Sequence, residues 1–450
     1  MSASQIPAMA VNPRQGQVSG FTHVVVLLTL ASTLSFIDRQ ILNVMIGPIK
    51  RDLGGLSDTE ISLIIGLAFS LVYTLASYPL AQMADRWNRR NIIAGGIFAW
   101  SLMTGLAGLA QSFWQLFAAR MGVGIGEASL GPASTSMIAD NFEQARLPLA
   151  FGIVATAPFI GSGLATLVGG PLIDYLETQP QIVVPVLGEL FSWQVVLILV
   201  GFPGVLLAAA MFTLREPPRT GVAADRTFTV GEVAAFALSR WRYLSLHFAG
   251  YLCLSIQGFA FLTWVVELFV RKFEWSRTEI GVTYGLIAIV VGIAGSVWSG
   301  WYAGRLIARK QGDAPMRIAL WSAVGLAPVA VAMPLLPSGM VAAVLLIPIT
   351  FCMAMPPGLS NAALQAIAPN RMRGQIIALY LISVSFLSYL FAPLIIGLMN
   401  DFVFRSESAI DLSMSTLAVI NYSIAIVCLS LSLKPLREAM DRVANEEFGA

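Results

Sequence analysis

Long apolar segments dominate this sequence, and each is long enough to cross a lipid bilayer as a helix. A membrane-spanning helix needs about 20 mostly apolar residues, because each residue adds only about 1.5 Å to its length. Twelve stretches meet this requirement, and they lie near residues 21–47, 59–84, 89–110, 113–139, 146–175, 191–214, 241–270, 277–307, 314–335, 337–366, 372–400 and 411–433. The sequence therefore predicts an all-α membrane protein with twelve transmembrane helices.

The composition supports this class and argues against others. Hydrophobic residues make up 57% of the chain and charged residues only 12%, unlike the usage of soluble domains. The net charge of +2 is too small to indicate a nucleic-acid partner. All three cysteines lie inside apolar segments, so they predict neither disulfides nor a metal site (Cys253, Cys352 and Cys428). No cofactor is expected.

One polar connection divides the chain into two halves. Residues 215–240 begin near a Pro pair and form the only long polar connection between apolar segments. We expect them to be a cytoplasmic linker between two six-helix bundles, at residues 21–214 and 241–433. Residues 1–20 and 434–450 are predicted to be cytoplasmic tails, and the first of these lacks the apolar core of a removable signal peptide.

An internal repeat relates the two halves. The segment SDTEISLIIGL, starting at Ser57, resembles SRTEIGVTYGL, which starts 219 residues later at Ser276. Both begin with Ser-x-x-Glu, the capping-box pattern of a helix start. Two parallel six-helix halves around an axis normal to the membrane are typical of transporters, whose substrate site lies between the halves near the bilayer midplane.

The positions of Lys and Arg predict the orientation. Most of the 27 basic residues fall in loops on the side of both chain termini, which the positive-inside rule makes cytoplasmic. Six fall on the opposite side, at Lys50, Arg51, Arg271, Lys272, Arg277 and Arg405. The predicted location is the inner (plasma) membrane. Both histidines, His23 and His247, begin helices at the cytoplasmic edge and are predicted to be interfacial.

Four charged residues lie inside predicted membrane helices. Asp38 and Arg39 are on the first helix, and Arg120 and Glu127 are on the fourth. An ionisable group at mid-membrane costs roughly 2.5 to 3.5 kcal/mol, so each should face protein or water and have a partner. Counted from the predicted helix ends, Asp38 and Arg120 lie at similar depths of about 14 and about 11 Å.

These charges can be paired in two ways. An ion pair of Asp38 with Arg120, or of Arg39 with Glu127, would make the burial of four charges possible. The carboxylates are then candidate proton-coupling groups, whereas the alternative is that the pairs only lock two helices together. The glycines near Glu127 also read as GVGIGE, similar to a dinucleotide-binding loop, but no strand precedes them.

The loop after the second apolar segment resembles a signature of a transporter family. It reads AQMADRWNRR, residues 81–90, and its charged residues are Asp85, Arg86, Arg89 and Arg90. This run is similar to the loop motif of the major facilitator superfamily, in which the acid helps to latch the cytoplasmic side. The second half has Gly304 where the acid would stand, so a symmetrical second latch is not expected.

Further stretches resemble the same family. Residues 120–128 are similar to its fourth-helix arginine motif, and APFIGSG, residues 157–163, is similar to its fifth-helix motif, often associated with antiporters. Within the family the chain resembles the spinster-like lipid transporters, through FIDRQILNV from Phe36, the segment from Leu56, ADRWNRR, and ARMGVGIGEASLGPAS from Ala119. The second half is less diagnostic.

The resemblance implies a proton-coupled secondary transporter of an amphiphilic, lipid-like solute, such as a lysophospholipid or a sphingosine phosphate, and favours export by antiport. Asp38 and Glu127 would carry protons, while Arg39 and Arg120 would pair with them or hold a head group. The second half offers possible cavity-lining polar groups in an otherwise apolar wall, at Gln257, Glu267, Asn361 and Gln365.

Two alternatives remain at this stage, a transporter of a small organic anion and a non-transporting membrane receptor. An enzyme or an ATP-driven pump is not expected, because the chain has no P-loop motif, no metal-ligand spacing and no histidine well inside the membrane. The expected partners are membrane lipids, the solute and protons, and the chain is expected to work as a monomer.

Overall fold

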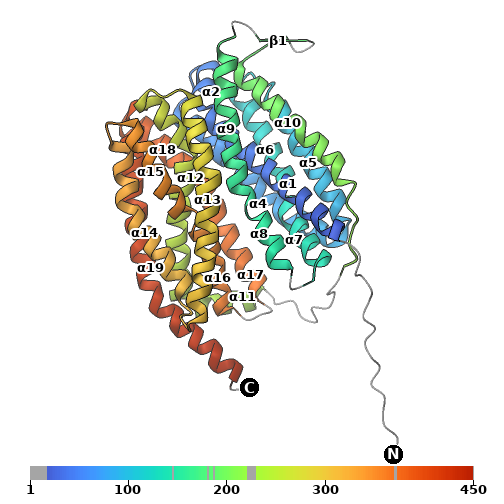
Figure 1. Cartoon of the computed structure of the whole chain (residues 1–450), viewed down its shortest axis with the longest axis vertical. Coiled ribbons are helices and arrows are strands. Elements are labelled where there is room, and N and C mark those ends of the chain that lie inside the picture. Colours follow the sequence, from blue (N-terminus) through green and yellow to red (C-terminus); the bar gives the residue numbers. More distant parts are fainter. Residues whose placement is uncertain are drawn as a thin grey trace, which may run out of the picture.

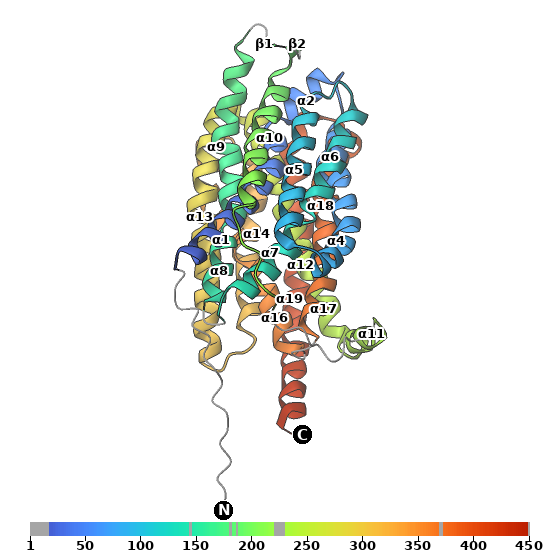
Figure 2. The same cartoon turned by 90° about the vertical axis from the view of Figure 1, so that its right-hand side faces the viewer.

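The computed structural model describes residues 18–143, 146–179, 182–185, 188–219, 230–368 and 372–448. They form two helical bundles side by side, the first half in blue to green and the second in yellow to red (Figure 1). Helix α1 begins and helix α19 finishes at one end of the molecule, here called the terminal face, and a β-hairpin marks the opposite end, the hairpin face (Figures 1 and 2). The predicted tail 1–20 and the middle of the predicted linker lie largely outside the described residues.

The helices of the first bundle follow the predicted apolar segments. They are α1 (Val18–Val44), α2 (Ile46–Asp52), α3 (Asp58–Ser62), the π-helix η1 (Leu63–Leu67), α4 (Ala68–Arg86), α5 (Arg89–Ala107), α6 (Phe113–Glu127), α7 (Leu130–Asn141), α8 (Leu147–Val154), α9 (Ala157–Glu177) and α10 (Ser192–Met211). Strands β1 (Ile182–Val184) and β2 (Gly188–Leu190) form an antiparallel hairpin before α10. This hairpin is a departure from the all-helical prediction.

The second bundle repeats the plan. Its elements are α11 (Val230–Ser239), α12 (Trp241–Phe273), α13 (Arg277–Ala308), α14 (Ala314–Ala332), η2 (Met333–Leu335), α15 (Gly339–Met353), α16 (Pro356–Ile367), α17 (Arg373–Tyr380), the π-helices η3 (Leu381–Ser385) and η4 (Met399–Val403) around α18 (Phe386–Leu398), η5 (Glu407–Ala409) and α19 (Ile410–Phe448). Helix α11 lies within the predicted linker, and α19 continues through most of the predicted tail.

Ten helical stretches among the described residues are long and apolar enough to cross a membrane. They correspond to ten of the twelve predicted segments; the other two are α5 and the stretch that is divided between α6 and α7. The count of twelve therefore stays a prediction. The two helix starts predicted from the repeat are confirmed, because Ser57 with Glu60 and Ser276 with Glu279 form complete capping boxes.

Glycines allow the two halves to touch backbone to backbone. Helix α9 packs along α13, and there a Cβ on Gly163 would lie 2.7 Å from the carbonyl oxygen of Gly285. A Cβ on Gly170 would lie 2.2 Å from the carbonyl oxygen of Arg277, so no larger residue fits without a shift. Helix α18 packs on α3 and η1 in a similar way, with Gly397 against the Asp58 carbonyl oxygen. Such small-residue contacts are a common way for membrane helices to associate.

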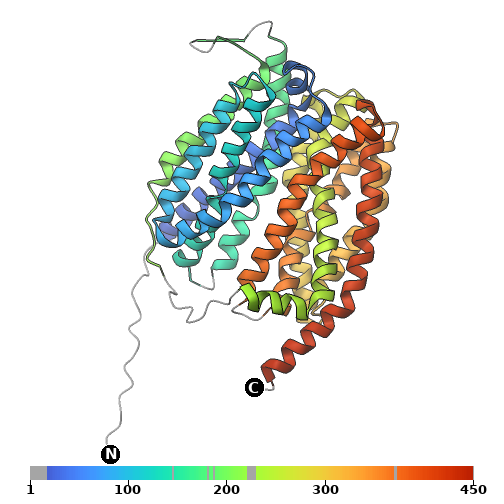
Figure 3. The ribbon, with the colours of Figure 1, turned by 180° about the vertical axis from the view of Figure 1, so that it is seen from behind.

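The buried apolar clusters show how the halves are joined. The largest cluster includes side chains from both halves, such as Ile41 and Met45 with Trp264 and Phe269. Two further clusters each stay within one half, around Trp100 in the first and around Tyr251 in the second. These separate clusters lie toward the terminal face, where the bundles diverge when the molecule is seen from behind (Figure 3). The halves therefore share one core toward the hairpin face and have separate cores toward the terminal face.

Candidate functional site

The four charges predicted inside the membrane lie close together in the first half. Arg39 Nε donates a hydrogen bond to Glu127 Oε2 over 2.6 Å, and Ser35 Oγ donates to the same oxygen over 2.6 Å. Arg120 donates from Nη1 to the backbone carbonyl of Asp38 over 3.2 Å. The predicted Arg39–Glu127 ion pair is therefore confirmed, whereas Arg120 hydrogen-bonds the backbone of Asp38 and not its carboxylate.

The Asp38 carboxylate is buried and has no ion pair within 4 Å among the described residues. Asp38 is 1% exposed. Trp100 and Thr104 are the side chains that can donate hydrogen bonds to it, and Arg120 supplies the nearby positive charge. Charged carboxylates are costly to bury in this way, and proton transfer is one way to relieve the cost.

Aromatic rings enclose the Arg39 guanidinium. Its central carbon lies 5.1 Å from the ring centre of Phe36, 4.7 Å from Phe69, 5.1 Å from Tyr73 and 5.5 Å from Tyr389. Arg39 Nη1 also donates to the Tyr389 hydroxyl over 3.0 Å. Because Tyr389 belongs to α18 in the second half, one arginine connects the acid of the first half to the opposite bundle.

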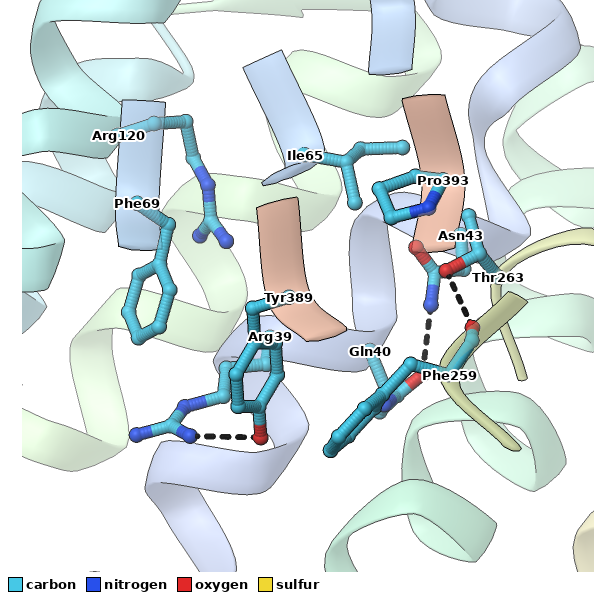
Figure 4. Close-up of a pocket in the computed structure, with 10 residues that line it drawn as sticks. All are labelled: Arg39, Gln40, Asn43, Ile65, Phe69, Arg120, Phe259, Thr263, Tyr389 and Pro393. Carbon is cyan, nitrogen blue, oxygen red and sulfur yellow. Dashed lines mark hydrogen bonds between the residues drawn. The ribbon is translucent and has the colours of Figure 1, made fainter. Parts of the chain in front are cut away.

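A narrow pocket with a cavity volume of about 30 Å³ lies between the halves beside these arginines (Figure 4). It is lined by Arg39, Gln40, Asn43, Ile65, Phe69, Arg120, Phe259, Thr263, Tyr389 and Pro393. The first half contributes both charged groups, while the second half contributes mainly rings and apolar surface. This volume is close to that of one water molecule and far below the roughly 300 to 1,000 Å³ of small-molecule sites, so the pocket would have to widen to hold a solute.

A buried ion-pair network joins the halves at the hairpin face. Asp58, which is 0% exposed, accepts from Arg271 over 2.7 and 3.0 Å and from Asn400 Nδ2 over 2.8 Å. Lys50 also donates to Asp58 and lies 2.9 Å from Glu407 of the second half. Removing one partner of a buried pair typically costs about 3 to 5 kcal/mol, so this network holds the hairpin face closed.

Two aspartates reach across the halves to helix starts in a reciprocal pattern. Asp401, after α18, accepts from the backbone N–H of Thr59 over 2.7 Å and from that of Asp58 over 3.3 Å. Asp174, near the end of α9, accepts from the N–H and the hydroxyl of Thr278, each over 2.7 Å. Thr59 and Thr278 are equivalent positions of the internal repeat. Each half thus supplies an anion to the positive end of a helix in the other.

The residues of the predicted latch lie at the terminal face. Arg89 is buried and pairs with Asp140 and, over 2.7 Å, with Glu216, so it binds within the first half. Arg90 donates its backbone N–H to Glu216 over 3.0 Å. Asp85 and Arg86 are exposed, and among the described residues neither carries a side-chain hydrogen bond or ion pair. The acid of the predicted latch is therefore disengaged in this conformation.

None of the four polar residues predicted for the second-half cavity lines the pocket described above. Glu267 belongs to the hairpin-face network, where it pairs with Arg271 over 2.9 Å and accepts from the N–H of Gly47. Gln257 is buried and bonded to Asn421, Asn361 is half-buried, and Gln365 is exposed. Their lining role stays a prediction.

The interfacial prediction for His247 is wrong. Its ring is 0% exposed and bonded on both nitrogens, to Tyr243 over 3.0 Å and to Ser360 over 3.1 Å. The ring of Tyr251 packs against it at 4.6 Å. Helix position alone suggested the membrane edge, but packing against α16 and α17 encloses the imidazole.

Sequence analysis also missed several residues that join the halves. Tyr389, Asp58, Asp174 and Asp401 were not singled out, because each is an ordinary helix-end or core residue until its partner is known. One signal was present: five of the six basic residues that depart from the positive-inside rule form ion pairs at the hairpin face with acids of the described chain, namely Lys50, Arg51, Arg271, Lys272 and Arg277.

Two helical bundles with a charged pocket between them, joined at one face and separate at the other, define a membrane transporter. The chain belongs to the major facilitator superfamily, whose sequence model matches residues 28–403. Its relatives and this fold are those of transporters and not of enzymes.

Relatives of several kinds match. An MFS-type efflux pump of Mycolicibacterium smegmatis is 31% identical over 67% of this chain and 65% of its own length. A probable L-galactonate transporter of Escherichia coli is 25% identical over 66% of this chain and 64% of its own length. Protein spinster homolog 1 of Mus musculus is 29% identical over 45% of this chain and 36% of its own length. The matches thus span slightly under two-thirds of the first two relatives and about a third of the spinster protein.

A solved structure shares the fold over nearly the whole chain. A bacterial homologue of the human lysosomal transporter Spinster, in an inward-facing and unoccupied conformation, superposes with a TM-score of 0.78. It covers 95% of this chain and 99% of its own at 23% identity. The resemblance to the spinster-like group is confirmed by this neighbour together with the mouse homologue.

Proposed function

We propose that this protein is a proton-coupled secondary transporter that moves an amphiphilic, lipid-like solute by alternating access. The observation that carries the proposal is the buried Asp38, Arg39, Arg120 and Glu127 group beside a pocket whose second wall is aromatic and apolar. A polar head would meet the arginines, and a hydrocarbon tail would follow the surface that includes Phe259 and Pro393. The sequence resemblance to the spinster-like lipid transporters favours a lipid solute.

Within this proposal, the terminal face is cytoplasmic, all twelve predicted segments span the inner membrane, and one chain is the working unit. The shared core at the hairpin face and the separate cores at the terminal face support an inward-facing conformation. Asp85 would engage when the terminal face closes, which fits its lack of a described partner here.

Asp38 and Glu127 are the proposed proton carriers. Glu127 is 1% exposed and its charge is balanced by Arg39, so protonation of Glu127 would release a buried cation for another anion. Arg120 has a single described hydrogen bond, to a backbone carbonyl, and it lines the pocket, so it is the candidate for the solute head group. The two carboxylates would bind protons as a coupled set, which Arg39 and Arg120 tune.

A small organic anion is the second candidate solute. Two arginines beside a small pocket could bind a carboxylate or a phosphate ester as readily as a lipid head group. The probable L-galactonate transporter among the relatives is the observation that favours this candidate.

A flux experiment tests both candidates. The purified protein is placed in proteoliposomes that contain a pH-sensitive dye, and lysophospholipid, sphingosine phosphate or galactonate is added outside. We expect proton movement with a lipid-like solute in the wild type and none in Glu127→Gln. A response to galactonate alone would assign the organic anion, and no proton movement with any solute would refute proton coupling to these classes.

A further inference from the structure

Tyr389 makes a polar contact across the pocket between the buried charges and the second half. Its hydroxyl accepts from Arg39 Nη1 over 3.0 Å, while the same guanidinium donates from Nε to Glu127 over 2.6 Å. Other described side-chain bonds between the halves include a long one from Asn43 Nδ2 to the Leu262 carbonyl over 3.5 Å at the pocket, and shorter ones toward the hairpin face, around Asp58, Asp174 and Ser62. Arg39 therefore stands between a titratable acid on α6 and a helix of the opposite bundle.

The ring of Tyr389 is held by neighbours that do not need its hydroxyl. It packs against Phe259 of α12 with ring centres 4.1 Å apart and meets Phe69 edge-on at 6.1 Å. A phenylalanine would preserve these contacts. The hydroxyl therefore adds one specific interaction, a hydrogen bond with Arg39 of the other half. Buried tyrosine hydroxyls usually have such a hydrogen-bond partner.

The position of Arg39 depends on the charge of Glu127. An ionised Glu127 holds Nε, and this fixes the guanidinium where Nη1 reaches Tyr389. A neutral Glu127 loses the Coulomb attraction, and the arginine is then free to follow the rings of Phe36, Phe69 and Tyr73. A change of one proton in the first half would then alter a bond to the second half.

We propose that Tyr389 is the positioning residue that couples protonation of Glu127 to the movement of the two halves, through its hydrogen bond with Arg39. This inference rests on the proposed proton-coupled function. The groups that face Glu127 are Asp38 and Arg39 on α1, Arg120 on α6, and Tyr389 on α18, with Tyr73 of α4 beside Arg39. Ionised Glu127 stabilises the conformation described here, and its protonation shifts the halves toward the alternative one.

The matched variants are Tyr389→Phe and Tyr73→Phe. Both rings face the Arg39 guanidinium, at 5.5 and 5.1 Å, but only Tyr389 carries a described hydrogen bond to it. Spin labels at Thr135 of α7 and Ala362 of α16, both exposed, report the separation of the halves toward the terminal face in lipid nanodiscs. Distances are measured between pH 5 and pH 8 without any solute.

We expect the wild type and Tyr73→Phe to shift between two distance populations on acidification. In Tyr389→Phe the change in the population ratio should be roughly tenfold smaller, because one hydrogen bond to a charged group has been lost. Its thermal midpoint should stay close to that of the wild type, which separates lost coupling from lost folding.

The outcomes are distinguishable. A Tyr389→Phe protein whose pH response equals that of Tyr73→Phe would overturn the coupling role while leaving proton coupling intact. A wild type without any pH response would overturn the proposed proton-coupled function, and the coupling role with it. If Tyr389→Phe unfolds at a markedly lower temperature, the hydroxyl is a structural group and the inference fails.

Discussion

At the scale of residues, the centre of the molecule contains four buried charged side chains, and neighbouring side chains compensate for the cost of burying them. Arg39 has a carboxylate, a tyrosine hydroxyl and four rings around it, whereas the Asp38 carboxylate has no ion pair within 4 Å among the described residues and lies beside Trp100 and Thr104. These two buried acids, one ion-paired and one beside neutral donors, are the two proposed places for a proton. The first prediction belongs here.

Neutralising either buried acid should uncouple conformation from pH. In Glu127→Gln and in Asp38→Asn, we expect the distance between labels at Thr135 and Ala362 to lose its dependence on pH, because no carboxylate remains to titrate at that position. Pulsed spin-label spectroscopy in nanodiscs measures this. Glu60→Gln, an exposed acid in a capping box, is the control. If both buried-acid variants respond to pH as the wild type does, the proton sites lie elsewhere.

At the scale of elements, polar contacts at helix ends join the two halves at the hairpin face. The starts of α3 and α13 each receive an aspartate from the other half, and Asp58 at the first of these is also the centre of the ion-pair network. The internal repeat therefore contains both the two capping boxes and the two sites where an aspartate of one half binds a helix start of the other. Mutation can separate the contributions of these two sites to closing the hairpin face.

Removing the crossing aspartates should open the hairpin face. Loss of a helix cap costs about 0.5 to 2 kcal/mol, so Asp401→Ala and Asp174→Ala should each favour the opened conformation by about 2- to 30-fold. Labels at the exposed positions Gln111 and Met340 report the opening. Replacing each aspartate by Asn keeps a hydrogen-bond acceptor, so the Asn variants should open the hairpin face less than the Ala variants do. Asp52→Ala breaks a pair with Arg51 inside one half and should leave the distance unchanged.

The predicted latch should stabilise closure of the terminal face, whereas the crossing aspartates stabilise closure of the hairpin face. If Asp85 binds only when that face closes, Asp85→Asn should raise the inward-open population, seen as longer Thr135 to Ala362 distances at neutral pH. Asp441→Asn, also an exposed acid near the terminal face on α19, serves as the comparison. Distance distributions that do not differ between the two variants would argue against a latch.

At the scale of the whole molecule, we expect the two walls of the pocket, one charged and one apolar, to determine how solute and proton interact. An anionic head that takes Arg120 would remove a cation from the carboxylates and draw in a proton, which is the logic of symport. A head whose positive end approaches Glu127 would compete with the proton, which is the logic of antiport.

We expect antiport, and therefore tighter solute binding at higher pH. The measurement is the dissociation constant of an identified solute against pH, by thermal stabilisation, because a ligand stabilises the protein in proportion to the logarithm of its excess over that constant. The dependence should disappear in Glu127→Gln. Binding that strengthens on acidification would reverse the assignment to symport.

Much of this architecture follows from the sequence alone. The apolar segment lengths fix helices that span a bilayer, because backbone groups in lipid must bond within their own helix. The Ser-x-x-Glu repeats fix two helix starts, and the cost of buried charge predicts that the buried charges are paired, either Asp38 with Arg120 or Arg39 with Glu127. The segment lengths and the capping boxes are local constraints. The choice of the Arg39–Glu127 pair, over 88 positions of the chain, was decided by the tertiary structure.

The contacts between the halves could be decided only by the tertiary structure. Tyr389 lies 350 positions from Arg39, and Asp401 lies 342 positions from Thr59, so no sequence period relates them. The reason is physical: rigid-body packing at glycine contacts such as Gly163 with Gly285 sets which helix ends meet, and which face of the molecule is closed. The burial of His247 and the place of Glu267 in the hairpin-face network follow from that packing in the same way, since a side chain's neighbours on other helices decide whether it faces lipid, water or protein.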